Sequence, residues 1–239
     1  MLPIIRRARK MIPAAALATG LMFSGAASAA HLDFEGYFQF TPLNESGVSG
    51  DGTITYDADN MLLNVNIIAE GLTPNQTHAQ HIHGRFDDDG NPIDSVNPTL
   101  ALDGNGGPVD GVISVPEGAN AYGPIILGLT DSGGMFPTVG DDGVLNFSQT
   151  YDLSDSSLLA DGFEVADLFD LFLREIVLHG GIVPGSIADD AGEFRPSLPV
   201  ASAEIGEVPI PGAALLFLTG GLAGAWRFGK KKLRVQNAS

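Results

Sequence analysis

Three of the five histidines of the chain lie in one short stretch, His78 to His83 in the letters HAQHIHG. Side chains of a β-strand alternate between two faces, so on a strand His81 and His83 share one face and Ile82 lies on the other. Two imidazoles on one face can bind a single borderline or soft divalent metal ion. His179, in IVLHG at the end of another β-rich run, is the candidate third ligand. The pattern predicts a copper or zinc site of these three histidines, with no catalytic role assigned to any residue.

The histidine pair has a second interpretation that the sequence leaves open. On a strand, His81 and His83 could be satisfied by hydrogen bonds to the backbone and to loops, with no metal ion. The two interpretations differ in whether the ring of His179 comes close to the other two.

A second metal hypothesis concerns the acidic stretch FDDDGNPID, residues 86–94. Calcium takes six to eight hard oxygen ligands, and a loop with closely spaced acids can supply several of them. The candidate calcium ligands are Asp87, Asp89, Asn91 and Asp94. The stretch lacks the glutamate that closes an EF-hand loop, so a solvated acidic turn is the alternative.

The elements that must position these residues are strands. Short alternating or apolar runs separated by Gly, Pro, Asn and Asp predict an all-β, antiparallel Greek-key sandwich or barrel. The stretch DADN, residues 57–60, predicts a hairpin turn. Residues 154–174 predict a short amphipathic helix pair broken at Gly162. The strand-like runs are 32–40, 50–72 (long enough for two strands), 78–84, 124–130, 144–153, 174–181 and 199–205.

Both ends of the chain have the composition of targeting segments. Residues 1–30 have a basic start, an apolar run and a small-residue finish, which predicts a cleaved secretory signal peptide. Residues 210–228 carry no charge except Arg227 and precede a basic cluster, which predicts one C-terminal transmembrane helix with the body outside the cytoplasm. The organisation is thus 1–30 signal, 31–207 β-sandwich domain and 208–239 tail.

The tail VPIPGAALLFLTGGLAGAWRFGKKK resembles the sorting signals of the PEP-CTERM class, in the variant with a Val-Pro-Leu-Pro motif. The motif residues are Val208, Pro209, Ile210 and Pro211, with Ile210 in place of the usual Leu. The resemblance implies an exosortase-type processing enzyme as a partner, and localisation in the cell envelope or outside the cell. The alternative is a plain membrane anchor.

The charge of the body restricts its partners. All twenty-nine acidic residues lie within 31–207, where only Arg85, Arg174 and Arg195 are basic, so the formal charge is 3 − 29 = −26. Nucleic acid and other polyanions are therefore excluded as partners, and cations are attracted. The chain has no cysteine, which excludes disulfides and thiol chemistry.

The stretch GLTPNQTHAQHIHG resembles the first histidine strand of copper-zinc superoxide dismutases and the strands of CHRD domains, modules named after chordin. Later landmarks are NPT at 97–99, REIVLHGG at 174–181 and SLPVASAEI at 197–205. The resemblance implies a superoxide dismutase-like sandwich in which His81, His83 and His179 match copper ligands. His78 matches a histidine that braces a loop.

The chain departs from the enzymes at several positions. Ser95 stands where they have a metal-bridging histidine, no histidine occurs between Gly84 and Leu178, and Ser202 replaces a disulfide cysteine. Arg195 lies near the position of an active-site arginine without aligning with it. We therefore expect an exported CHRD-type structural or adhesive protein of the envelope or extracellular matrix, with polysaccharide or matrix partners and no catalytic activity. The alternative is a copper-binding redox protein derived from superoxide dismutase.

Overall fold

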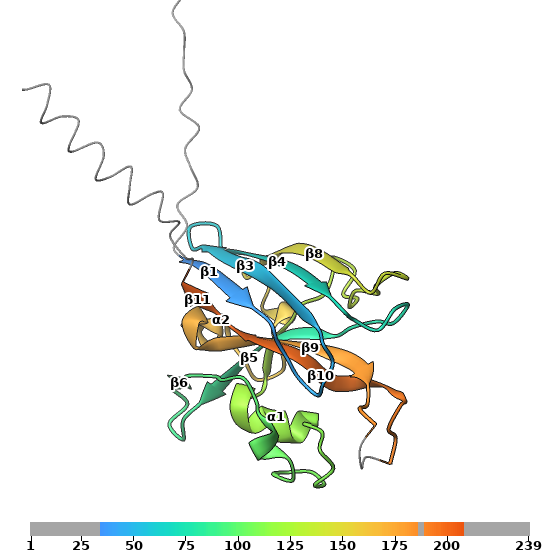
Figure 1. Cartoon of the computed structure of the whole chain (residues 1–239). Helices are drawn as coiled ribbons and strands as arrows, with labels where there is room; N and C mark the ends of the chain where they lie inside the picture. The colour runs from blue at the N-terminus through green and yellow to red at the C-terminus, as the bar shows by residue number, and fades with distance from the viewer. Residues whose placement is uncertain (1–33, 186–188, 208–239) are drawn as a thin grey trace, which may run out of the picture. The chain divides into compact units, whose positions relative to one another are not determined.

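The computed structural model describes residues 34–185 and 189–207 (Figure 1). These residues form two antiparallel β-sheets packed face to face, with few helices, so the predicted all-β sandwich is confirmed. The five-stranded sheet has the order β11 (Gly206–Glu207), β1 (Phe34–Gln39), β3 (Ser49–Asp57), β4 (Leu62–Glu70) and β8 (Leu145–Asp152). The six-stranded sheet has the order β2 (Thr41–Pro42), β10 (Phe194–Glu204), β9 (Arg174–Ile182), β5 (Gln80–Phe86) and β6 (Pro92–Ile93), and β7 (Ile125–Gly128) also pairs with β5.

The core lies between the sheets because apolar residues alternate along the strands. In β4, Leu63, Val65 and Ile67 are fully buried, and the residues between them point outward. Ile82 and Ile176 face them from the six-stranded sheet and belong to the same apolar cluster. One face of each strand is therefore committed to the core, which leaves the residues at alternate positions on the outer face.

The described chain crosses between the two sheets several times. It leaves β4 for β5 in the other sheet, and after β7 it returns to form β8 beside β4. The long segments between β6 and β7 and between β7 and β8 pass over the outer face of the six-stranded sheet.

The predicted hairpin at 57–60 is confirmed, since β3 ends at Asp57 and β4 begins at Leu62 in antiparallel pairing. The Asp57 carboxylate accepts hydrogen bonds from the backbone N–H of Asn60 at 3.1 Å and from its amide at 2.8 Å. The turn is thus closed by local side-chain bonds of the kind that Asp and Asn favour.

Helical structure differs from the expectation in two places. The pair predicted for 154–174 is wrong in length, because the segment forms only the turns η2 (Ser156–Leu158), α2 (Val165–Leu168) and η3 (Leu171–Leu173). An unexpected helix, α1 (Val115–Tyr122), follows the short turn η1 (Leu100–Leu102). The Ser114 and Glu117 side chains form a capping box at its start, with the Ser114 hydroxyl donating to Glu117 Oε2 at 2.6 Å.

Arg174 fixes the segment that follows α2. Its side chain is 0% exposed, and it donates to the backbone oxygens of Asp167 at 2.7 Å and Phe169 at 2.9 Å. Its guanidinium also lies 5.0 Å from the centre of the Phe86 ring. Gly84 provides the space, because a Cβ there would lie 2.7 Å from Arg174 Cδ. A buried cation is stabilised here by carbonyl dipoles and an aromatic face.

The predicted signal peptide (1–30), the sorting motif (208–211) and the transmembrane segment (210–228) lie outside the described residues. Within 34–185 and 189–207, no helix is both long enough and apolar enough to span a bilayer.

We expect Arg174→Ala to lower the free energy of unfolding by about 3 kcal/mol or more, because it leaves buried carbonyl oxygens without a charged donor. Arg195→Ala is the matched control. Arg195 forms a partly exposed ion pair with Asp190, so its loss costs about 1 kcal/mol or less. Urea unfolding of both variants measures the difference, and equal losses would contradict the structural role given to Arg174.

Candidate metal centre

The structure brings together the three histidines that the sequence singled out. His81 and His83 lie on β5 and pair with Val177 and Glu175 of β9, and His179 lies two residues beyond Val177. All three side chains therefore point from the outer face of the six-stranded sheet. One ring nitrogen of each histidine lies within 4.8 Å of the others, and among the described residues this is the one group of three or more such side chains that is gathered so closely.

Two of the rings are fixed by backbone carbonyls. His83 Nδ1 lies 2.8 Å from the Gly123 oxygen, and His179 Nδ1 lies 3.0 Å from the Ser197 oxygen. A carbonyl oxygen only accepts, so the proton of each neutral ring sits on Nδ1 and the lone pair on Nε2. Gly123 can supply its oxygen because it ends α1 with φ +80°, a conformation that glycine adopts without strain.

The free nitrogens of the cluster have no partner. His83 Nε2, His179 Nε2 and His81 Nδ1 are buried and make no hydrogen bond to the described residues. His83 and His179 are 2% and 4% exposed, whereas His81 is partly exposed. Buried polar atoms normally have partners, and three histidines that each have an unpartnered ring nitrogen match the donor set of a transition-metal ion. The residues present therefore fit copper or zinc.

Burial keeps these rings neutral. Desolvation, helped by the proximity of His179, lowers the pKa of His81 from 6.5 to about 3. Desolvation also lowers the pKa of His83 to about 3, against the opposing effect of its bond to Gly123. The pKa of His179 is lowered by burial as well. Neutral imidazole is the form that binds metal, so at pH 7 no proton competes for the three nitrogens.

The spacing of the nitrogens sets what binding requires. Around one ion at about 2.0–2.1 Å, two ligand atoms can be no more than about 4.2 Å apart. The limit of 4.8 Å in the structure is slightly wider than this. Binding one ion therefore requires the three rings to move closer together, and His81 is the partly exposed member whose ring is not held by a backbone carbonyl.

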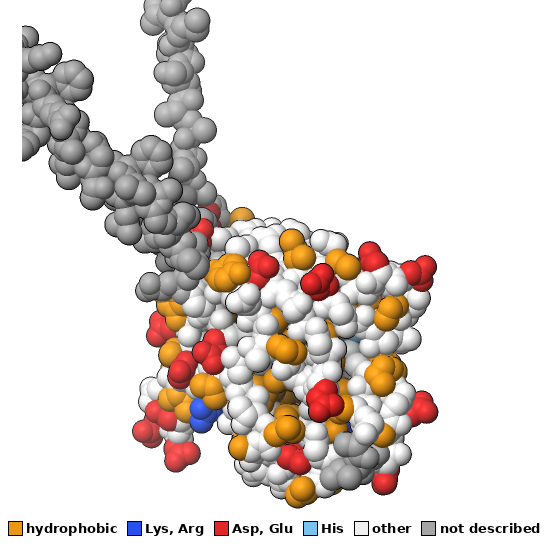
Figure 2. Space-filling view, viewed as in Figure 1, with side chains coloured by type: hydrophobic (Ala, Val, Ile, Leu, Met, Phe, Trp, Pro, Cys, Tyr) orange, Lys and Arg blue, Asp and Glu red, His pale blue; other side chains and the backbone are white. Residues whose placement is uncertain are grey.

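Aromatic rings cover the cluster on two sides. The Tyr122 ring of α1 lies 4.6 Å from His83, and the Phe136 ring lies 5.1 Å from His81. The acidic side chains are spread over the visible surface rather than gathered around one point (Figure 2). The cluster is thus a desolvated, uncharged site inside a strongly acidic domain.

The positions at which the sequence departs from superoxide dismutases have structural roles here. The Ser95 hydroxyl accepts from the Arg85 backbone N–H at 3.1 Å and ties the loop after β6 to β5. The Ser202 hydroxyl donates to Asn97 Oδ1 at 2.6 Å. A serine side chain offers no nitrogen atom to a metal ion, so Ser95 cannot act as the bridging histidine does. Arg195 is paired with Asp190.

His78 is not a member of the histidine cluster. Its two ring nitrogens lie 3.0 Å from the backbone oxygens of Thr73 and His179, and its side chain is 0% exposed. It therefore fastens the loop before β5 to β9.

The predicted calcium ligands do not form a group of three carboxylates. Asp87 Oδ1 accepts from the backbone N–H groups of Asp89 at 3.0 Å and Asn91 at 2.7 Å, which closes a turn between β5 and β6. Asp87, Asp89, Asn91 and Asp94 are all exposed. The geometry is that of an acidic turn held by its own bonds, and the calcium hypothesis for it stays a prediction.

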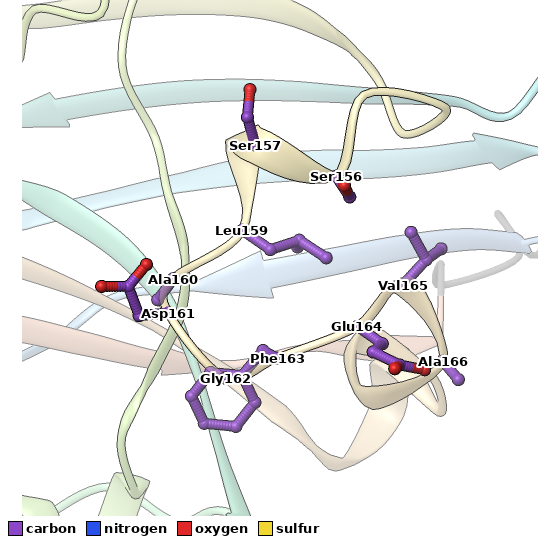
Figure 3. A pocket seen from close by; sticks show the side chains of 10 residues that line it. All are labelled: Ser156, Ser157, Leu159, Ala160, Asp161, Gly162, Phe163, Glu164, Val165 and Ala166. Atoms are coloured by element: carbon purple, nitrogen blue, oxygen red, sulfur yellow. The ribbon is translucent and has the colours of Figure 1, made fainter.

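A large hollow of about 650 Å³ lies away from the histidines and is lined by one segment, residues 156–166. Figure 3 shows Leu159 extending toward its middle and the Asp161 and Glu164 carboxylates on separate sides. Among the described residues that line this hollow, no acidic side chain is paired with a histidine or with a second acid in a way that suggests catalysis.

Sequence reasoning missed Glu175, a 0% exposed acid on β9 directly opposite His83. The signal that could have found it is the alternation from His179, since residues 175, 177 and 179 share one face of the strand.

No protein-family model matches the chain, and a search of curated proteins returns no match.

We expect acid to destabilise the protein through His83. Its pKa is lowered in the folded state, so between pH 6.5 and about 3 the unfolded state binds a proton that the folded state does not. The free energy of unfolding then falls as the pH falls, by about 1.4 kcal/mol per pH unit for such a group. Urea unfolding at several pH values should show a shallower decline for His83→Gln. Parallel curves for the two proteins would contradict the assignment.

Proposed function

We propose that the domain binds one copper or zinc ion through His81, His83 and His179. The observation that carries this proposal is the set of three buried, unpartnered ring nitrogens, two of them oriented by backbone carbonyls. The same locks that fix the tautomer of a metal-binding histidine in other proteins are supplied here by Gly123 and Ser197.

The ion would have a structural or storage role rather than a dismutase role. A body of formal charge −26 repels superoxide and other small anions. The basic side chains in the described ranges are otherwise engaged: Arg174 bonds to carbonyls in the core, Arg195 pairs with Asp190, and Arg85 donates to the Asp94 oxygen at 3.0 Å. None of these side chains is directed toward the cluster to guide an anion.

The setting that we propose for this metal-binding domain is outside the cell. The composition of residues 1–30 supports export, and the Val208–Pro211 motif with its apolar segment and basic end supports delivery to the envelope by an exosortase-type enzyme. In that setting the CHRD-type domain serves as a structural or adhesive component that contacts polysaccharide or matrix.

We expect the protein to bind one equivalent of copper or zinc after loading, and His179→Ala or His83→Ala to reduce the affinity by at least tenfold. Asp89→Asn, which changes an exposed acid of the turn between β5 and β6, should retain the metal and is the control. Metal analysis after dialysis measures the stoichiometry. Absence of a stoichiometric ion in the unaltered protein, or retention of it in both cluster variants, would contradict the proposal.

The mass of the mature protein tests the proposed delivery. A product that begins near residue 31 and lacks residues 230–234 is expected if both ends are processed. A mature product that still carries the basic end shows that the tail is a permanent anchor, which rules out the exosortase-type partner.

A further inference from the structure

A row of two acids and one histidine crosses the outer face of the six-stranded sheet. Glu175 of β9 lies directly opposite Glu204 of β10 on one side and opposite His83 of β5 on the other. Directly opposed residues of antiparallel strands point to the same face. Two carboxylates in this arrangement repel each other unless a proton or a cation lies between them.

Glu175 has no partner in its buried position. It is 0% exposed, and neither carboxylate oxygen makes a hydrogen bond to the described residues. The Ser202 hydroxyl is near enough to lower its pKa, but that hydroxyl donates to Asn97 Oδ1 at 2.6 Å. Burial is the larger effect, and with Glu204 and Asp94 it raises the pKa of Glu175 to about 8. A buried carboxyl group without a donor is costly, and it needs a compensating interaction.

The groups around Glu175 offer oxygen atoms. Glu204 is exposed, and its Oε1 accepts from the Asn97 backbone N–H at 3.3 Å and from the Asn97 amide at 3.2 Å. Asn97 Oδ1 and the Ser202 hydroxyl lie in the same chain of contacts.

No cationic side chain in the described part of the chain neutralises this cluster. Arg174, the neighbour of Glu175 in sequence, lies on the opposite face of β9 and bonds to carbonyls in the core. Arg85 donates to the backbone oxygen of Asp94, and neither Glu175 nor Glu204 forms an ion pair with a described arginine.

From this geometry we propose that Glu175 and Glu204 form a calcium site, with the side-chain oxygens of Asn97 and Ser202 as neutral ligands. Carboxylate, amide and hydroxyl oxygens are the hard ligands that calcium binds, unlike the nitrogen set of the histidine cluster. The excess of negative charge on the domain raises the local concentration of divalent cations. Glu175 lies opposite His83 but is not one of the three proposed nitrogen ligands, so the calcium site does not rest on the metal of the histidine cluster.

The test is calcium binding by the full chain, freed of metal with a chelator and measured by calorimetry in the presence of excess magnesium. We expect one calcium ion to bind to the unaltered protein, and Glu175→Gln and Glu204→Gln each to lower the affinity at least tenfold. Glu175→Gln keeps the size of the side chain and removes a buried carboxyl group, so urea unfolding should show that the calcium-free variant remains folded.

Two further variants locate the ion. Asp89→Asn alters the acidic turn between β5 and β6, and His179→Ala alters the histidine cluster. If both variants still bind calcium while Glu175→Gln does not, the ion is located at Glu175. Loss of binding in Asp89→Asn with retention in Glu175→Gln would assign the ion to the turn and overturn the proposal. The absence of stoichiometric calcium in the unaltered protein would also overturn it.

Discussion

The geometry of the site depends on two hydrogen bonds from imidazole to the backbone. By holding the protons of His83 and His179 on Nδ1, the carbonyls of Gly123 and Ser197 leave the Nε2 lone pairs free inside the domain. Neither carbonyl belongs to the strand that carries its histidine. One ends α1, and the other lies within β10 where the pairing with β9 is irregular. The end of helix α1 and the irregular part of β10 therefore orient the rings.

This arrangement buries polar side chains on the outer face of the six-stranded sheet. Sheets in sandwiches commonly bury one face and expose the other to water. In β9, residues 174–181 are buried on both faces, although they include Arg174, Glu175 and His179. On the inner face the charge of Arg174 is stabilised by backbone oxygens. On the outer face, one ring nitrogen of each cluster histidine and both Glu175 oxygens have no hydrogen-bond partner among the described residues, which is why both proposed ion sites lie there.

The strands and the histidine cluster could be predicted because alternation fixes which side chains share a face. His81 and His83 follow from that rule, and His179 followed from its position on another β-rich run. The two carbonyl bonds could not be predicted, because they depend on where the end of α1 lies and on the irregular pairing of β10 with β9. The spacing of Ser114 and Glu117 is that of a capping box, so the start of helix α1 could have been predicted from the sequence. The pattern at 154–174 failed as a helix pair because its apolar residues pack around short turns beside Arg174.

The pairing of β1 with β11 brings the two ends of the described chain together. Gly36 lies opposite Glu207, so the described chain begins and ends at the same edge of the five-stranded sheet. Helix α1, which covers His83 through Tyr122, lies at the other end of the domain (Figure 1). The edge at which the described chain begins and ends is thus separate from the end of the domain that carries α1 and the ring of Tyr122 over His83.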